Sequence, residues 1–588
     1  MINRERDAEA PLAAWSEPRV VAPVLLLLSA ALSYYFADYR LPSADEGALL
    51  TNATKLVGGG VFYQHVDAYP FPFAPYFLAA AFSLFGEHLS VARACAGLFF
   101  CVTTVSLYGI ALHLIDRKRA ALFAAVLLSF KFLAYPSFTV YAYWDLAFCF
   151  GCVAILLLVA HPFRGATLRL AAGGLAVGLA LVSKQNLGIY LGGACGLLML
   201  CAGPLLGVKR ERPRELISEL LVFGVTSLLP LGVMAAYFSS KGLLWTMLES
   251  GLLAPFIGYV GTSSIPFSVP LEWWKFGELA GFAGVQYQPE PIWQLLSLER
   301  IPGASWYPSY WIALEVFVRS LYSSVPLAFV GAAVVAWRPA DRSALRPFTV
   351  VAALALVTLA SAFPRADYGH IISIYPLVTL ILFALLARAR AWEALVWRSQ
   401  VGAVGVLLLL CGGLTLQNHS YLTHRTDLER ARVWVAPESW VESVVNEVNA
   451  VLEEGDPLFV YGQEAEYYFL TGHLFPWRFA QLYPGQAGGD EGKTLLKLFR
   501  REAPQLVIRG MMGWPGLPPL PYYAQKLDRH LSQKFSMEPG VFERYPLAEG
   551  NEPPPWWALS ILRPCPRPIA ACDKWSDFVD RQPPLPLD

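Results

Sequence analysis

The sequence is poor in charge, and the charges it has are balanced. Only 15% of its 588 residues are Asp, Glu, Lys or Arg, and 45 acidic and 45 basic residues give a net charge of +0. Without an excess of either sign there is no global field to attract nucleic acid, so we expect no nucleic-acid partner. Hydrophobic residues make up 55% of the chain. This composition excludes both a soluble globular protein and a long disordered chain.

Few cysteines lie outside the apolar stretches, where a disulfide framework would form. Seven of the nine cysteines lie in apolar stretches, where cysteine packs as a small hydrophobe. Cys149 and Cys152 form a CxxC pair, but without histidine or a second pair the pattern favours packing. Cys565 and Cys572 lie in the polar tail and would be able to form a disulfide if that tail is outside the cytoplasm.

A cleavable signal and an internal repeat are also missing. Residues 1–18 include acidic residues, and no small-residue cleavage motif follows the first apolar stretch, so we expect an uncleaved anchor. No repeat of the kind found in many transporters stands out.

Long apolar stretches dominate the first 416 residues. A membrane core about 30 Å thick needs roughly 20 apolar residues per helix. The stretches of suitable length number about eleven: 20–36, 91–115, 120–136, 143–161, 168–184, 187–207, 216–238, 311–337, 348–363, 371–387 and 399–416. The fold class expected is an α-helical polytopic membrane protein.

Basic residues gather in alternate loops. They lie before residue 20 and near 117–119, 164–169, 209–214, 338–346 and 388–398, whereas the opposite loops carry few. The positive-inside rule therefore predicts a cytoplasmic N-terminus and an outer-facing C-terminal tail. The membrane we expect is the inner (plasma) membrane of a bacterium.

These patterns divide the chain into three parts. Residues 1–19 are a cytoplasmic N-terminus, 20–416 a membrane domain, and 417–588 an extracytoplasmic α/β domain with a Pro-rich end. The small α/β fold is expected over about 425–545, with helices near 441–452 and 464–471 and strands near 457–461 and 505–509. Two long outer segments, 37–90 and 239–310, interrupt the spans, and Phe73–Gly86 is expected to lie along the membrane surface.

Two adjacent carboxylates follow the first span, in the stretch Leu41-Pro-Ser-Ala-Asp-Glu-Gly47. Ser43 and Glu46 have the spacing of a capping box, which predicts a helix that starts here, runs to about Val57 and ends at the three glycines 58–60. Asp45 then sits in the first turn, where the helix dipole favours its ionised form. On these residues alone, a general base, a metal ligand and an ordinary helix start all remain open.

Further ionisable residues lie at predicted span ends on the same outer side. They are Arg93, Asp145, Lys184, Arg365 and His370. Each has an ordinary explanation: the lysine and arginines can snorkel to lipid headgroups, the aspartate can form an ion pair, and the histidine can cap a helix. Together they make one layer with acids and cations, which suits binding of a lipid phosphate and deprotonation of an acceptor.

The order of these motifs resembles a known family. Asp45-Glu46-Gly47, Gly60-Val-Phe-Tyr63, a Pro-rich approach to a helix ending Leu84-Phe-Gly86, and Arg93 are similar to the opening of the family 39 and lipid A aminoarabinose-type glycosyltransferases. Asp145 and Lys184 resemble the second acid and the lysine of that family, and Arg365–His370 with Tyr375-Pro376 resembles its late His-and-Pro segment. One departure is Phe73-Ala-Pro75, where the aminoarabinose type has Lys-Pro-Pro, so Lys184, Arg365 or His65 would have to replace that lysine.

The resemblance implies a GT-C fold and a sugar transferred from a polyprenyl-phosphate carrier to an extracytoplasmic lipid, glycan or protein. It implies Asp45 as general base with Glu46 and Asp145 as further catalytic acids, and Lys184, Arg365, Arg93 and His370 as donor-phosphate ligands. Asp45, Glu46 and Asp145 offer oxygen ligands to a divalent metal, but no further acid cluster completes a shell, so we expect no cofactor. The competing classes are a flippase for lipid-linked sugars, which needs no base, and a non-catalytic membrane scaffold.

Overall fold

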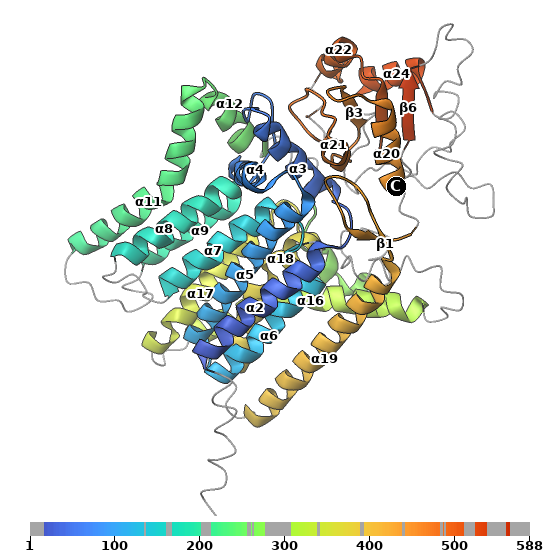
Figure 1. The fold of residues 1–588 in the computed structure, drawn as a ribbon. Coiled ribbons are helices and arrows are strands. Elements are labelled where there is room, and N and C mark those ends of the chain that lie inside the picture. The colour runs from blue at the N-terminus through green and yellow to red at the C-terminus, as the bar shows by residue number, and fades with distance from the viewer. Residues whose placement is uncertain are drawn as a thin grey trace, which may run out of the picture.

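The structure is a computed structural model that describes most of the chain: residues 17–134, 137–159, 167–201, 213–255, 260, 264–276, 307–337, 342–388, 393–437, 441–482, 486, 490–510, 524–537 and 560–564. A bundle of long helices is joined to a small C-terminal domain, which lies at one end of the bundle (Figure 1). The expected disulfide between Cys565 and Cys572, the segment 277–306 and the Pro-rich end beyond 564 lie outside the described residues.

Each of the eleven predicted spans is a helix. They are α2 (Pro18–Ala37), α5 (Leu89–Leu114), α6 (Arg117–Leu133), α7 (Tyr143–Val159), α8 (Thr167–Ser183), α9 (Gln185–Leu200), α11 (Pro213–Ser240), α16 (Tyr307–Trp337), α17 (Arg342–Ala360), α18 (Tyr368–Leu386) and α19 (Glu393–Tyr421). Six helices of the described chain are long and apolar enough to cross a membrane, and several shorter helices are also apolar. The predicted helical polytopic fold class is confirmed.

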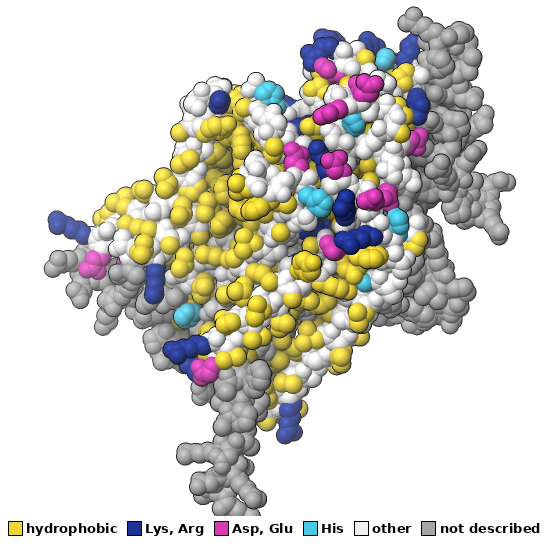
Figure 2. Space-filling view, viewed as in Figure 1, with side chains coloured by type: hydrophobic (Ala, Val, Ile, Leu, Met, Phe, Trp, Pro, Cys, Tyr) yellow, Lys and Arg dark blue, Asp and Glu magenta, His cyan; other side chains and the backbone are white. Residues whose placement is uncertain are grey.

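Apolar side chains cover the visible face of the bundle, while charged side chains gather on the C-terminal domain and at the opposite end (Figure 2). Leu27 of α2, Val225 of α11 and Leu409 of α19 are 69%, 64% and 78% exposed. Such a contiguous apolar surface is typical of a protein whose surroundings are lipid.

Both helices predicted in the first loop form. α3 (Ala44–Val57) has Ser43 as its N-cap, and the Ser43 hydroxyl accepts the Glu46 N–H. The helix ends before Gly58, in agreement with the sequence. α4 (Phe73–Phe85) packs beside α3 and is too short to qualify as a span.

The C-terminal domain contains a four-stranded mixed sheet in the order β3-β4-β6-β5. β3 (Leu458–Tyr461) and β4 (Leu506–Arg509) are parallel and fully buried, close to the predicted strands. The helices α20 (Val441–Val451), α21 (Glu466–Thr471), α22 (Lys493–Glu502) and α24 (Gln525–Lys534) accompany them, and β5 (Phe535–Met537) completes one edge. β6 (Ser560–Pro564) pairs with β4, so the sheet extends beyond the expected limit near residue 545.

The C-terminal domain is attached to α3. Thr51 donates to the Ala465 carbonyl at 2.9 Å, Lys55 Nζ donates to the Trp477 carbonyl at 2.7 Å, and the Gln481 side chain donates to the Ala44 carbonyl at 2.9 Å. Two short strands, β1 (His424–Arg425) and β2 (Trp434–Val435), form a second link, because Tyr39 pairs with Trp434. The helix with the two adjacent carboxylates is therefore in contact with both parts of the protein.

Gly47 is required for this attachment. A Cβ atom at Gly47 would lie 2.4 Å from the Glu466 backbone nitrogen and 2.5 Å from its Cα. Because these atoms belong to the backbone, they cannot move away without a cost in free energy. We expect Gly47→Ala to weaken the attachment by about 1–3 kcal/mol, as overpacking does in protein cores. Limited proteolysis of the C-terminal domain and thermal unfolding would measure the loss.

Gly58→Ala is the matched control at the other end of α3. Its Cβ would meet only the Lys55 and Thr54 carbonyl oxygens at 3.6 Å, and its φ is −69°. Equal protease resistance of the two variants would contradict the close packing described for Gly47.

Candidate functional site

The two adjacent carboxylates have different surroundings. Asp45 is exposed in the first turn of α3, whereas Glu46 is 1% exposed. The Glu46 carboxylate accepts hydrogen bonds from Arg93 Nη2 at 3.1 Å and from the Tyr141 N–H at 3.1 Å. The predicted capping box is thus half formed, because Glu46 binds Arg93 and Tyr141 while its own N–H is capped by Ser43.

Arg93 is enclosed by protein. Its side chain is 0% exposed, and besides Glu46 it donates to the Ala37 and Tyr39 carbonyls at 3.0 and 2.7 Å. The guanidinium therefore joins α5 to the end of α2 and to α3. The guanidinium thus has a supporting role in the structure, and the phosphate ligand expected from the sequence stays a prediction.

Removing one partner of a buried ion pair leaves the other charge uncompensated, which costs about 3–5 kcal/mol. We expect Arg93→Met to lower the thermal stability of the purified protein by an effect of this size. The double variant Arg93→Met/Glu46→Leu should recover part of the loss, because neither charge then remains. A single variant as stable as the wild type would show that the pair does not contribute.

Asp145 lies in the first turn of α7 and is 2% exposed. Its Oδ2 accepts the Phe138 N–H at 2.8 Å. The N–H of Tyr141, three residues after Phe138 in the same connection, donates to Glu46. Glu46 and Asp145 therefore hold two points of one short segment between α6 and α7.

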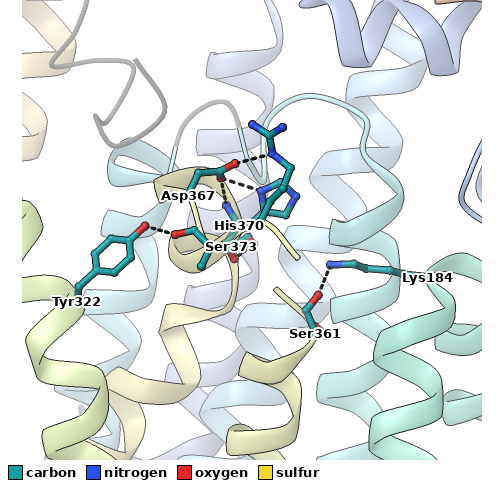
Figure 3. A network of polar contacts seen from close by, with 8 residues as sticks. Lys184, Tyr322, Ser361, Asp367, His370 and Ser373 are labelled. Carbon is teal, nitrogen blue, oxygen red and sulfur yellow. Dashed lines mark hydrogen bonds and ion pairs between the residues drawn. The ribbon is translucent and has the colours of Figure 1, made fainter. Parts of the chain in front are cut away.

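Lys184 occupies the single residue between α8 and α9 (Figure 3). This sharp turn depends on Gly188, since a Cβ there would lie 2.2 Å from Leu181 Cα. Lys184 Nζ donates to the Ser361 carbonyl at 3.0 Å, and Asn186 donates to the Ser361 and Phe363 carbonyls at 2.9 and 3.1 Å. The turn is thereby fixed against the connection between α17 and α18.

That connection carries the Arg365–His370 motif. Asp367 caps α18 and binds two side chains of the motif: Arg365 Nε lies 3.2 Å from Oδ2 and His370 Nδ1 lies 2.7 Å from Oδ1 (Figure 3). Burial alone would raise the pKa of Asp367, but His370 and Arg365 together lower it to about 2. The ionised carboxylate fixes the orientation of both neighbours. Their side chains are 9% and 27% exposed, unlike that of Arg93.

The structure thus brings together part of the predicted layer. The charge of Lys184 interacts with those of both Asp145 and Asp367, and the rings of Trp144 and His370 lie 6.2 Å apart. His65, the other candidate for the missing lysine, accepts the Val61 N–H in its own loop. Within the described residues, no group of three His, Cys, Asp or Glu side chains has a metal-binding arrangement.

Asp45 borders a part of the chain that the sequence did not connect with the site. Burial raises the pKa of Glu466 in the C-terminal domain well above its usual range, and the charges of Glu464 and Asp45 raise it further. Burial also raises the pKa of Glu464 to about 7. Burial beside Asp45 therefore favours the protonated form of Glu466.

Asp367 and Lys131 were not among the site residues predicted from the sequence. Asp367 lies within the Arg365–His370 motif, of which only the two end residues were predicted to belong to the site. Lys131 was detectable, because it is a lysine within a predicted span, and ionisable residues at that depth are functional candidates.

Comparison with known proteins gives one family match and several similar folds. Residues 69–207 match the family of dolichyl-phosphate-mannose-protein mannosyltransferases, a segment that includes Arg93, Asp145 and Lys184. ArnT from Cupriavidus metallidurans in the apo state aligns with a TM-score of 0.52 at 13% identity, over 92% of this chain and 97% of that chain. No curated protein sequence matches the chain.

Two other solved structures are less similar. ArnT from Cupriavidus metallidurans bound to undecaprenyl phosphate gives a TM-score of 0.48 at 13% identity, over 92% of this chain and 97% of that chain. The Archaeoglobus fulgidus oligosaccharyltransferase tethered with an acceptor peptide gives 0.46 at 10% identity, over 90% and 74%. The chain therefore has the GT-C fold that it shares with apo ArnT, and residues 69–207 are similar to the dolichyl-phosphate-mannose-protein mannosyltransferases.

Proposed function

We propose that the chain takes a sugar from a polyprenyl phosphate and transfers it to an acceptor outside the cytoplasm. The observation that carries this proposal is the group of Lys184, Arg365 and His370 around one turn at a helix end, beside Asp145. Cations at the end of a membrane helix suit a lipid phosphate. The description of the matching family, a dolichyl-phosphate-mannose-protein mannosyltransferase, supports a lipid-linked donor of this class.

In the proposed reaction, Asp45 accepts the proton of an acceptor hydroxyl or amine, whose oxygen or nitrogen forms a bond to the anomeric carbon. The bond from that carbon to the phosphate oxygen breaks, and the polyprenyl phosphate leaves with the electron pair. A single displacement inverts the anomeric configuration. Asp45 suits the role of base because it is exposed and lies in the first turn of α3, where the dipole favours the carboxylate.

The leaving phosphate gains negative charge as the bond breaks, and fixed cations are the strongest source of stabilisation for such a change. We assign this role to Lys184, Arg365 and His370. Asp145 positions the substrate and orients Lys184. Glu46 holds the backbone at Tyr141, and Arg93 holds the backbone at Ala37 and Tyr39. The proposal therefore gives Arg93 no contact with phosphate.

The test is transfer by the purified protein in lipid vesicles, with a panel of polyprenyl-phosphate sugars and membrane lipid or glycan acceptors. We expect glycosylated acceptor and free polyprenyl phosphate in equal amounts. Movement of the intact lipid-linked sugar across the vesicle membrane, without release of polyprenyl phosphate, would instead identify a flippase.

A further inference from the structure

Lys131 is a buried lysine with a specific set of partners. It lies in α6, two residues before the helix ends at Leu133, and is 1% exposed. Its Nζ donates to the Phe138 carbonyl and lies 4.9 Å from the centre of the Phe100 ring. Among the groups whose charge acts on it, Asp145 is the most favourable and Arg93 opposes it. A lysine in this position requires compensation, because an unpaired buried cation is costly.

Phe138 links Lys131 to Asp145. Its carbonyl accepts from Lys131, and its N–H donates to Asp145 Oδ2. Its φ is 61°, in the left-handed region that side chains other than Gly, Asn and Asp rarely adopt. Such a conformation persists only where the surroundings enforce it. Here the lysine and the aspartate hold the two polar groups of the same residue, and the ring packs against Phe100 and Phe148.

This arrangement, the Phe138 clamp (Lys131, Phe138 and Asp145), engages one oxygen of Asp145. Within the described chain, the other oxygen, Oδ1, has no hydrogen-bond partner although it is buried. Asp145 also interacts with the charge of Lys184. The clamp therefore holds the carboxylate by Oδ2 and leaves Oδ1 unengaged. Asp145 is also the residue that connects the clamp to Lys184.

We propose that Lys131 is a positioning residue of the transfer site, acting through Phe138 to fix the orientation of Asp145. This inference rests on the proposed function and extends it to a side chain that contacts no substrate. It predicts that Lys131 matters for catalysis only while Asp145 is present to be positioned.

The test is a double-mutant cycle of Lys131→Met and Asp145→Asn, with kcat/KM for transfer and the Tm measured for all four proteins. We expect Lys131→Met to lower kcat/KM about 10-fold, an effect typical of outer residues that orient a functional group. In the Asp145→Asn background the same change should cost less than about twofold. Equal losses in both backgrounds, or coupling in the Tm without coupling in kcat/KM, would overturn the proposal and leave Lys131 a structural residue.

Two further variants complete the experiment. Ser129→Ala is the matched control, because Ser129 is buried in the same helix and, among the residues that the structure describes, bonds only the Val126 carbonyl of its own helix. We expect wild-type transfer. Lys131→Arg keeps a charge and donors, so it should restore more activity than Lys131→Met, and serves if the methionine variant does not fold. Inactivity of both wild type and Ser129→Ala would contradict the proposed function. Active proteins with equal losses in both backgrounds of the cycle would contradict only the role of Lys131.

Discussion

Asp45→Asn should reduce kcat for sugar transfer by at least about 100-fold, the lower range for removal of a general base. The amide cannot accept the acceptor's proton, but it preserves the size and most of the polarity of the side chain. Because Asp45 is exposed in the first turn of α3, loss of its charge should cost only about 0.3–1 kcal/mol of stability. The measurement is single-turnover transfer together with thermal unfolding.

Ser43→Ala is the control for this prediction. It removes the side chain that caps α3 at Glu46 but leaves Asp45 unchanged. If Asp45 were only part of a helix start, the two variants would behave alike, with a small loss of stability and nearly normal transfer. A large loss of transfer in Asp45→Asn alone supports the role of base.

Lys184→Met should lower kcat/KM for the lipid-linked donor by about 100- to 1,000-fold, as loss of one fixed donor to a developing anion does in other enzymes. Methionine keeps the length and apolar character of the side chain, so the change acts mainly on charge. The effect should appear for every donor of the class, since the phosphate is common to all. The measurement is the initial rate of polyprenyl phosphate release over a range of donor concentrations.

Asn186→Ala tests whether Lys184 acts only as a tether. Asn186 donates to the Ser361 carbonyl, as Lys184 does, and also to the Phe363 carbonyl, but carries no charge. Its loss should therefore loosen the same turn with much less effect on donor use. If both variants lost donor use equally, the contribution of Lys184 would be structural.

Local patterns in the sequence predict the helices well. Apolar stretches of span length, the Ser43 cap and the glycines 58–60 each act within a few residues, and the corresponding helices form there. β6 shows where such patterns stop. Its residues pair with β4 across a separation of more than 50 positions, and nothing local fixes that partner.

The partners of the charged residues were harder to predict. An arginine at the end of a span has the same sequence signal whether it faces lipid, substrate or a buried acid, so the ion pair of Arg93 and Glu46 could not be deduced from either residue. The attachment of the C-terminal domain to α3 likewise depends on tertiary packing around Gly47. Lys131 differs, because a lysine within a span is itself a signal.

The central claim is a single displacement in which Asp45 removes the acceptor's proton. The most direct measurement is the anomeric configuration of the transferred sugar, determined by NMR on donor and product. We expect the configuration to be inverted in the product. A retained configuration would require two displacements, with a group of the protein bonded to the sugar in between, and would contradict the role of Asp45 as base.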